Sequence, residues 1–209
     1  MFLDELPEFN KNTLEVMRQP LEDGQVTISR VNATLTYPSK FMFISSMNPC
    51  PCGYFGSKEK ECTCSPAQIS KYLSKISGPL LDRIDIHIEV TPVKYKHLEN
   101  ITETESSLII KQRINKARKI QSNRYEELNI FSNSELTPKL IDKYCELDVT
   151  SKKILEDAFN KLGLSARAYG RILKVARTIA DLDGSENIGA MHLAEAIQYR
   201  SLDRKYGKH

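Results

Sequence analysis

The 209-residue sequence contains no tryptophan, and only 8% of its residues are aromatic. It has no apolar run close to the roughly 20 residues that a membrane-spanning helix needs. Its N-terminus lacks the basic segment followed by an apolar one that marks a secretory signal. Its five cysteines therefore do not indicate the disulfide framework of a secreted domain. These absences predict a cytoplasmic protein without a membrane segment, and the 40% of apolar residues suffice for an ordinary core.

The sequence also lacks the loop with which P-loop proteins hold phosphates. The pattern Gly-x-x-x-x-Gly-Lys-Ser/Thr, whose backbone amides cradle phosphate oxygens, occurs nowhere in it. Charge of one sign is not in large excess either, since the formal net charge is only +3. The basic excess lies in the C-terminal half, which is a mild indication of a polyanionic partner there.

The first nine residues, Met-Phe-Leu-Asp-Glu-Leu-Pro-Glu-Phe, predict the end of a buried strand that delivers two adjacent carboxylates to a sheet edge. Asp4 can hold Mg²⁺ through oxygen ligands, and Glu5 beside it can polarise an attacking water. The same pattern also fits a strand that simply ends in acidic surface residues. The order of the features that follow favours the catalytic interpretation.

Two strand patterns come next. Alternating apolar residues over 26–37 predict a β-hairpin with Arg30 at its tip. The continuous apolar run that begins at Phe41 predicts an interior strand over 41–46, covered on both faces. Asn48 would then lie just past a strand end, where open α/β sheets bind their ligands. An amide there can orient a water or contact a terminal phosphate, whereas an ordinary turn residue is the alternative.

Four cysteines follow Asn48 in two Cys-x-Cys pairs, Cys50 with Cys52 and Cys62 with Cys64. Four thiolates suffice for a closed tetrahedral Zn²⁺ site of the structural kind. The spacing within each pair is tighter than the usual two to four residues. A polar surface loop with reduced thiols is therefore an equally weighted alternative to a zinc site.

The segment after the cysteines predicts a helix from Ser65 to Lys75 and a strand at 84–90. In that strand Ile84, Ile86, Ile88 and Val90 would face one way, with the polar residues, including His87, on the other face. Arg83 stands immediately before it. A polar, irregular linker is expected over 93–105.

The remainder predicts a helical bundle, with helices at about 106–125, 137–145, 150–162, 165–182 and 189–201. The first has six basic residues and no acidic one among them: Lys111, Arg113, Lys116, Arg118, Lys119 and Arg124. Such a run indicates either a solvated face or contact with nucleic acid. The helix at 165–182 has Arg167 in its first turn.

Several stretches, taken in order, resemble one family. They are the first nine residues, the hairpin with a cation at its tip, Ser-Met-Asn-Pro-Cys-Pro-Cys-Gly, Gly-Pro-Leu-Leu-Asp-Arg-Ile-Asp-Ile-His and Leu-Ser-Ala-Arg-Ala-Tyr-Gly-Arg-Ile-Leu-Lys-Val-Ala-Arg. Over nearly its whole length the chain resembles the magnesium-chelatase-like AAA+ ATPases. Within them it is similar to the bacterial branch of competence-associated DNA-remodelling proteins.

The resemblance implies a fold and a set of roles. Residues 1–92 would form the C-terminal half of an α/β AAA+ core, with few parallel strands plus a β-hairpin. Residues 106–209 would form an all-α helical-bundle lid, which makes the chain mostly α. The matching positions are the Walker B pair at Asp4 and Glu5, sensor 1 at Asn48, the pre-sensor-1 hairpin with Arg30, the arginine finger at Arg83 and the sensor 2 arginine at Arg167.

The resemblance further implies ATP and Mg²⁺ as cofactors, a hexameric ring of identical subunits, and DNA as the substrate, contacted by Arg30. Because the family's phosphate loop precedes its Walker B strand, we expect this chain to be the C-terminal part of a longer protein and to be inactive alone. One alternative is a chelatase subunit that drives Mg²⁺ insertion into a porphyrin. Another is a zinc-stabilised helical binding module without motor activity. The four-cysteine insert resembles the DNA-linked branch more than the chelatase subunit.

Overall fold

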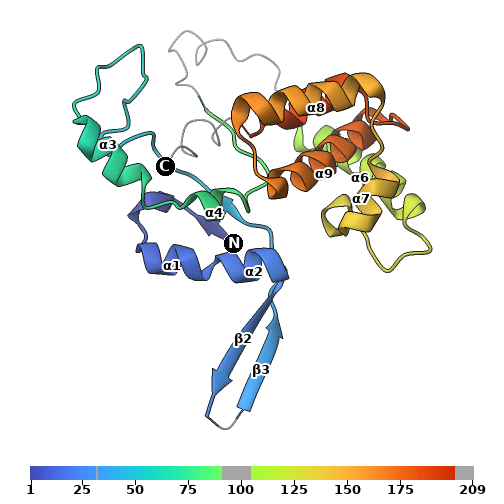
Figure 1. Ribbon diagram of the computed structural model, residues 1–209, viewed down its shortest axis with the longest axis horizontal. Coiled ribbons are helices and arrows are strands. Elements are labelled where there is room, and N and C mark those ends of the chain that lie inside the picture. Colours follow the sequence, from blue (N-terminus) through green and yellow to red (C-terminus); the bar gives the residue numbers. More distant parts are fainter. Residues whose placement is uncertain (32, 91–104, 201–209) are drawn as a thin grey trace. The chain divides into compact units, whose positions relative to one another are not determined.

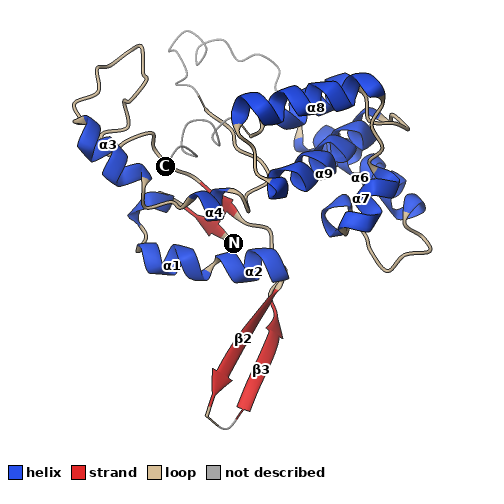
Figure 2. Ribbon diagram, in the orientation of Figure 1, coloured by secondary structure: helices blue, strands red, loops and turns tan. Residues whose placement is uncertain are grey.

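The computed structural model describes residues 1–31, 33–90 and 105–200, which form two compact units. The N-terminal unit extends from Met1 to Ile84, and the helical unit begins at Asp85. Figure 1 labels the elements in chain order, and Figure 2 separates the few strands from the many helices. The predicted linker at 93–105 falls almost entirely outside the described residues, so it stays a prediction.

The N-terminal unit is organised around two short parallel strands. Strand β1 (Phe2–Leu3) pairs with β4 (Ile44–Ser45), with Phe2 opposite Ile44. A 3₁₀ turn, η1 (Leu6–Glu8), follows β1 directly. A small core packs beneath them, in which the buried residues are Leu6, Leu14, Ile76, Leu80 and Leu81. Both strands point their C-terminal ends at the same edge because they are parallel.

Two short helices connect β1 to the hairpin. Helix α1 (Lys11–Val16) begins at Asn10, whose side chain accepts a hydrogen bond from the Asn12 amide at 2.9 Å. Helix α2 (Arg18–Asp23) ends at Gly24, which adopts the left-handed conformation at φ 63°. Pro20 lies in the first turn of α2, where proline is tolerated.

The hairpin is the longest β structure in the described residues. Strands β2 (Gln25–Arg30) and β3 (Ala33–Pro38) are antiparallel, with Arg30 opposite Ala33 at the turn. One face is apolar, and the other is a row of hydroxyl pairs: Thr27 bonds Thr36 and Ser29 bonds Thr34, each at 3.1 Å. The ribbon extends away from α1 and α2 in Figure 1. This confirms the hairpin with Arg30 at its tip.

Two predicted strands differ from the structure. The strand expected over 41–46 is regular only at Ile44–Ser45, and Met42 is 76% exposed. A two-stranded sheet has no second layer among the described residues to bury both faces of that run. Residues 84–90 form no strand: Ile88 is 66% exposed whereas His87 is buried, the reverse of the expected pattern. The His87 amide donates to the Tyr199 carbonyl at 2.7 Å, so its backbone bonds to the end of a helix instead of a sheet.

Helix α3 (Pro66–Leu73) begins with a reciprocal capping pair, Ser65 and Gln68. The single turn α4 (Gly78–Leu81) is capped by the Ser77 side chain and supplies Leu80 and Leu81 to the core. Arg83 follows two residues after α4.

The helical unit contains α6 (Ser107–Arg124), η2 (Asn133–Glu135), α7 (Pro138–Tyr144), α8 (Val149–Leu162), α9 (Ala166–Asp183) and α10 (Ala190–Gln198). The side chains of Ser106, Asp148 and Ser165 cap three of these helices at their N-termini. Helix α9 supplies the largest share of the core, through Ala168, Ile172, Leu173, Ala176 and Ala180. A mostly helical chain with a short parallel pair and one hairpin confirms the predicted fold class.

A buried polar network fastens α9 to the rest of the helical unit. The Asp181 carboxylate accepts hydrogen bonds from Arg124 at 2.5 and 3.0 Å and from Arg177 at 3.1 Å. It also accepts one from the Asn133 amide at 2.8 Å, and Asn133 in turn accepts from the Tyr125 hydroxyl. Asp181 thus neutralises part of the charge of two neighbouring guanidinium groups, and these hydrogen bonds stabilise one arrangement of α6, η2 and α9.

Candidate functional site

The adjacent acidic residues Asp4 and Glu5 emerge where β1 ends. Hydrogen bonding between the two segments continues past the ends of the strands, since the Ser46 amide donates to the Leu3 carbonyl at 3.0 Å and the Leu6 amide to the Ser46 carbonyl at 2.9 Å. The Ser46 hydroxyl donates to Asp4 Oδ1. Asp4 is therefore held by the neighbouring strand, while its carboxylate stays exposed at the sheet edge.

Glu5 has an unusual backbone. Its φ of 51° makes it the one non-glycine residue with a positive φ among those described. This left-handed conformation costs of order 1–3 kcal/mol for such a residue. The Glu5 amide offsets part of that cost by donating to Asp4 Oδ1 at 3.1 Å and to the Ser46 hydroxyl at 3.3 Å. The sharp turn leaves the Glu5 carboxylate exposed beside Asp4, as a water-polarising group requires.

Asn48 lies three residues beyond β4, at the same edge. Its backbone amide lies near the phenol of the buried Tyr72 on α3. Burial raises the pKa of that phenol, as do the negative charges of Glu8 and Glu5, and the Asn48 amide opposes the rise. Both the Glu5 charge and the Asn48 backbone amide affect the pKa of Tyr72. The strand-end carboxylates and Asn48 therefore lie in the same region of the N-terminal unit.

Arg83 is bound within its own unit. Its Nη1 donates to the Pro79 carbonyl at 2.7 Å, and its Nε lies 2.9 Å from Glu22 Oε2 at the end of α2. Only 9% of the side chain is exposed. Any contact between this guanidinium and a neighbouring subunit's nucleotide would require it to leave Glu22.

The remaining predicted cations are exposed. Arg30 is at the hairpin tip, and Arg167 is on the first turn of α9. The basic run on α6 is also largely exposed, apart from Arg124, which bonds Asp181. The structure thus places Asp4, Glu5 and Asn48 just past the ends of two paired strands, holds Arg83 in an ion pair with Glu22, and leaves Arg30 at the far end of the hairpin.

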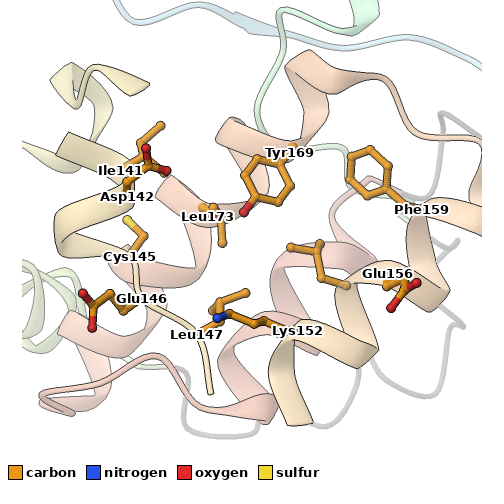
Figure 3. A pocket seen from close by; sticks show the side chains of 11 residues that line it. Ile141, Asp142, Cys145, Glu146, Leu147, Lys152, Glu156, Phe159, Tyr169 and Leu173 are labelled. Carbon is orange, nitrogen blue, oxygen red and sulfur yellow. The ribbon is translucent and has the colours of Figure 1, made fainter. Parts of the chain in front are cut away.

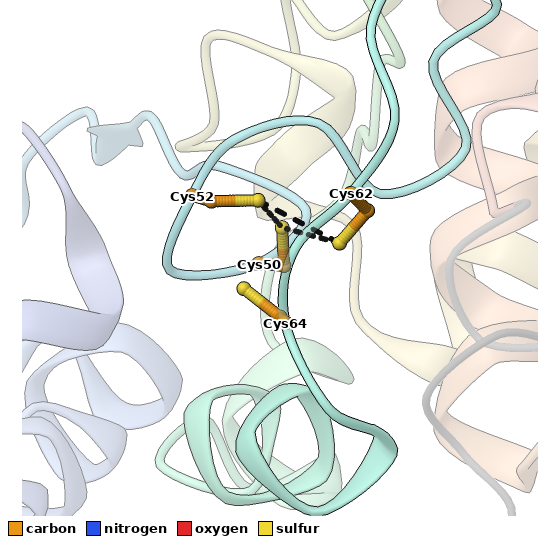
Figure 4. A group of neighbouring side chains, drawn as sticks. All are labelled: Cys50, Cys52, Cys62 and Cys64. Atoms are coloured by element: carbon orange, nitrogen blue, oxygen red, sulfur yellow. Dashed lines mark hydrogen bonds between the residues drawn. The ribbon is translucent and has the colours of Figure 1, made fainter.

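The four cysteines converge from two ends of one loop (Figure 4). Their sulfur atoms all lie within 4.8 Å of one another. The Sγ–Sγ distances are 3.4 Å for Cys50 and Cys52, 3.7 Å for Cys50 and Cys62, and 3.6 Å for Cys52 and Cys62. All four are free thiols, and Cys50 is fully buried. The predicted set is therefore a metal-competent cluster.

The cluster has uneven thiol acidities. The backbone amide of Tyr54, aided by that of Thr63, lowers the pKa of Cys52 to about 5. The Cys64 amide acts in the same sense on Cys62, but burial and the neighbouring sulfurs outweigh it and raise the pKa of Cys62 to about 12. Four thiolates this close repel one another, so a cation at their centre would stabilise all four.

Comparison with known families accounts for nearly the whole chain. The profile described as magnesium chelatase, subunit ChlI, matches residues 1–98, and the profile for the C-terminal part of the same subunit matches residues 104–200. The chain belongs to the magnesium chelatase ChlI-like family. The strand edge with Asp4 and Glu5 falls in the first matched segment, and most of the helical unit falls in the second.

Similar full-length proteins are considerably longer than this family member. The chain is 45% identical to the competence protein ComM of Haemophilus influenzae over 205 residues, and 43% identical to the uncharacterised protein YifB of Escherichia coli. It is 32% identical to the uncharacterised protein Rv2897c of Mycobacterium tuberculosis. The matches cover 96–98% of this chain but only 39% of each relative. Across 1–31, 33–90 and 105–200, no helix has the length and apolarity required to cross a bilayer.

The helical unit of this family member also has an open cavity of about 690 Å³ between α7, α8 and α9 (Figure 3). Cys145, Leu155 and Leu173 line its apolar part. The rings of Tyr169 and Phe159 make an edge-to-face contact, with their centroids 6.0 Å apart. None of the predicted site residues lines it. Burial raises the pKa of Cys145 to about 11, which keeps that thiol protonated and unreactive.

Three residues near the candidate site were missed by the sequence analysis: Ser46, Tyr72 and Glu22. Each acts through a contact with a residue distant in sequence, to Asp4, Asn48 and Arg83 respectively. Only Ser46 had a usable signal, because a hydroxyl at the end of a strand beside a strand-end carboxylate is a natural hydrogen-bond donor.

Proposed function

We propose that this chain supplies the second half of the ATPase core, and the lid, of a magnesium-chelatase-like AAA+ motor that acts on DNA. The observation that supports this most is the paired strand edge: Asp4 and Glu5 follow β1, Asp4 is held by Ser46, and Asn48 follows the parallel β4. Open α/β proteins bind and process nucleotides at such an edge.

In this proposal each residue at the strand edge has a different role in ATP hydrolysis. The Asp4 oxygen that is not held by Ser46 is available to a Mg²⁺ hydration shell, and Glu5 orients and polarises the attacking water. Bound Mg²⁺ neutralises charge that develops on the phosphate oxygens. Asn48 hydrogen-bonds the water or the terminal phosphate, while Arg83 and Arg167 approach the phosphates from other directions.

The phosphate loop is not part of this chain, so it would have to come from the region of the longer relatives that the chain does not match. ATP is then bound by the full-length protein. Arg83 acts on a neighbouring subunit's nucleotide, and the working form is a ring of identical subunits, for which six is the number that the resemblance implies. The four cysteines hold Zn²⁺ as a structural ion with no part in phosphate chemistry.

DNA is the proposed substrate because the hairpin presents Arg30 beside its exposed turn and a row of hydroxyl groups along its other face. Cations and hydroxyls contact phosphates without reading bases. The name competence protein of one relative agrees with this choice. The second candidate function, a chelatase motor that acts on a porphyrin, is supported by the names of both matching profiles. The hairpin discriminates between them.

Replacing Arg30 with alanine in the full-length protein is expected to weaken DNA-coupled ATP turnover equally for all sequences. Basal turnover should stay near the wild-type rate because the tip is far along the ribbon from the Asp4 edge. Loss of one phosphate contact should also reduce the salt slope of DNA affinity by about 1. Phosphate release measured with several DNA sequences and salt concentrations checks this.

A Lys116→Ala, Lys119→Ala double variant on α6 is the matched control, since it removes exposed positive charge elsewhere. Equal DNA stimulation in the Arg30→Ala protein, with loss in the α6 variant, would move the DNA contact to the lid. DNA stimulation absent from the wild type, together with porphyrin-dependent turnover, would instead favour the chelatase function.

A further inference from the structure

The spacing of the cysteine sulfurs matches a single tetrahedral ion. A regular tetrahedron with Zn–S bonds of about 2.3 Å has sulfur atoms about 3.8 Å apart. The Sγ–Sγ separations among Cys50, Cys52 and Cys62, which are 3.4, 3.6 and 3.7 Å, lie just below that value. They are far from the roughly 2.05 Å of a disulfide. The loop is therefore folded around the volume of one ion, not around a covalent bridge.

The backbone of the loop is shaped to bring the two cysteine pairs together. Gly53 and Gly56 adopt φ near 80°, which lets the loop turn back tightly enough to bring the two pairs together. These features favour a structural site that is closed by four protein ligands.

This cluster is joined to the candidate ATPase site through Asn48. Cys50 is the second residue after Asn48, it is fully buried, and the Gly53 amide donates to its carbonyl at 3.0 Å. A Cβ placed on Gly53 would lie 4.0 Å from Asn48 Oδ1, so the loop passes directly beside that side chain. The phenol of the buried Tyr72 lies near the Asn48 backbone amide.

We infer that one Zn²⁺ bound by Cys50, Cys52, Cys62 and Cys64 positions Asn48, with Tyr72 as its second support. The ion fixes the chain immediately after Asn48, and the Tyr72 hydroxyl fixes its amide. Both constraints together hold one orientation of the side chain at the strand edge. That orientation matters for catalysis only if Asn48 has the proposed ATPase role. Zinc binding and the positioning of Asn48 are independent of that role.

The metal is tested first on the tag-free 209-residue chain. Elemental analysis should find about one zinc per chain, and replacement by Co²⁺ should give the intense visible and thiolate charge-transfer absorption of a tetrahedral tetrathiolate site. A Cys62→Ser, Cys64→Ser variant should lose both signals. Cys145→Ser is the matched control, because Cys145 is buried in the helical unit and lies outside the cluster. Folded wild-type protein without metal would overturn the inference.

The positioning role is tested by nuclear magnetic resonance of the same chain. Removing zinc with a chelator should shift and broaden the Asn48 backbone and side-chain signals and the Tyr72 ring signals. Signals of α8 and α9 should not change. Tyr72→Phe should keep one zinc and still move the Asn48 signals, which separates positioning from metal binding even if the cysteine variant fails to fold. Asn48 signals that stay unchanged both on zinc removal and in the Tyr72→Phe variant would contradict the inference.

These outcomes do not depend on catalysis. An inactive full-length protein whose Asn48 signals respond to zinc would refute the proposed ATPase function and leave the positioning role intact. An active full-length protein whose Asn48 signals do not respond to zinc would support the proposed ATPase function and refute the positioning role.

Discussion

Replacement of Arg83 by alanine in the full-length protein is expected to lower ATP turnover by about 10³–10⁵-fold while nucleotide affinity stays nearly unchanged. The physical reason is that a guanidinium delivered by a neighbouring subunit stabilises charge that appears only as the phosphoryl group is transferred. Single-turnover phosphate release, with nucleotide binding measured separately, checks both parts of the expectation.

The structure supplies a matched control for this prediction. Arg83 Nε lies 2.9 Å from Glu22 Oε2, so Glu22→Gln breaks the same ion pair without removing the guanidinium. If Arg83 acts on a neighbour's nucleotide, Glu22→Gln retains turnover and only Arg83→Ala loses it. Mixed rings of Arg83→Ala and Glu5→Gln subunits should also recover activity. Equal losses in Arg83→Ala and Glu22→Gln would show that Arg83 is a structural link between α2 and the end of α4.

The second large effect concerns the stability of the helical unit. Asp181→Asn should destabilise it by about 3–5 kcal/mol, because the buried Arg177 and the partly buried Arg124 lose their shared counter-charge. Asp181 is 1% exposed, so water does not replace the lost interaction. The change corresponds to a fall in Tm of more than about 10 °C for a unit of this size. Thermal unfolding followed by circular dichroism, with hydrogen exchange at α9, measures it.

Asp183→Asn provides the comparison within the same helix. Asp183 is exposed, and its hydrogen bond from Ser185, followed by that from His192, lowers the pKa of its carboxyl. Because solvent reaches this carboxylate, removing its charge should shift Tm far less than Asp181→Asn does. If the two variants unfold at the same temperature, the buried network is not what stabilises α9.

Local signals in the sequence were sufficient for the features whose geometry is determined by neighbouring residues. The alternation from Val26 to Tyr37 determined the hairpin and placed Arg30 at its tip. The caps at Asn10, Ser65 and Ser165 follow from short polar side chains that precede apolar periodicity. The helical unit followed from the same kind of local pattern, including the stop at Gly163.

Patterns that depend on distant partners were misleading. The alternation over 84–90 is typical of a strand, but a strand needs a neighbour to accept its hydrogen bonds, and the His87 amide donates to Tyr199 instead. The run from Phe41 was expected to be covered on both faces, yet only Ile44–Ser45 pairs with β1. Alternation and apolarity indicate that a segment can form a strand, but they do not indicate whether the fold provides a neighbouring strand for it to pair with.

The candidate site shows the same division. Asp4, Glu5 and Asn48 were predicted at strand ends, and the parallel pairing of β1 with β4 brings those ends together. The supports were not predictable, because Ser46 contacts Asp4 across 42 positions of sequence. The pairing of Arg83 with Glu22 likewise depends on how α2 packs. The functional roles of all these residues stay predictions.

ATP hydrolysis by the full-length protein, compared with that of its Glu5→Gln variant, tests whether the Asp4–Glu5 edge is an ATPase site. We expect Mg²⁺-dependent phosphate release by the wild type. Glu5→Gln should abolish that release while ATP binding persists, because Glu5 polarises the water and does not hold the nucleotide. The 209-residue chain, which contains no phosphate loop, should release no phosphate above background. Undiminished turnover in full-length Glu5→Gln, or Glu5-dependent turnover by the 209-residue chain alone, would contradict this expectation.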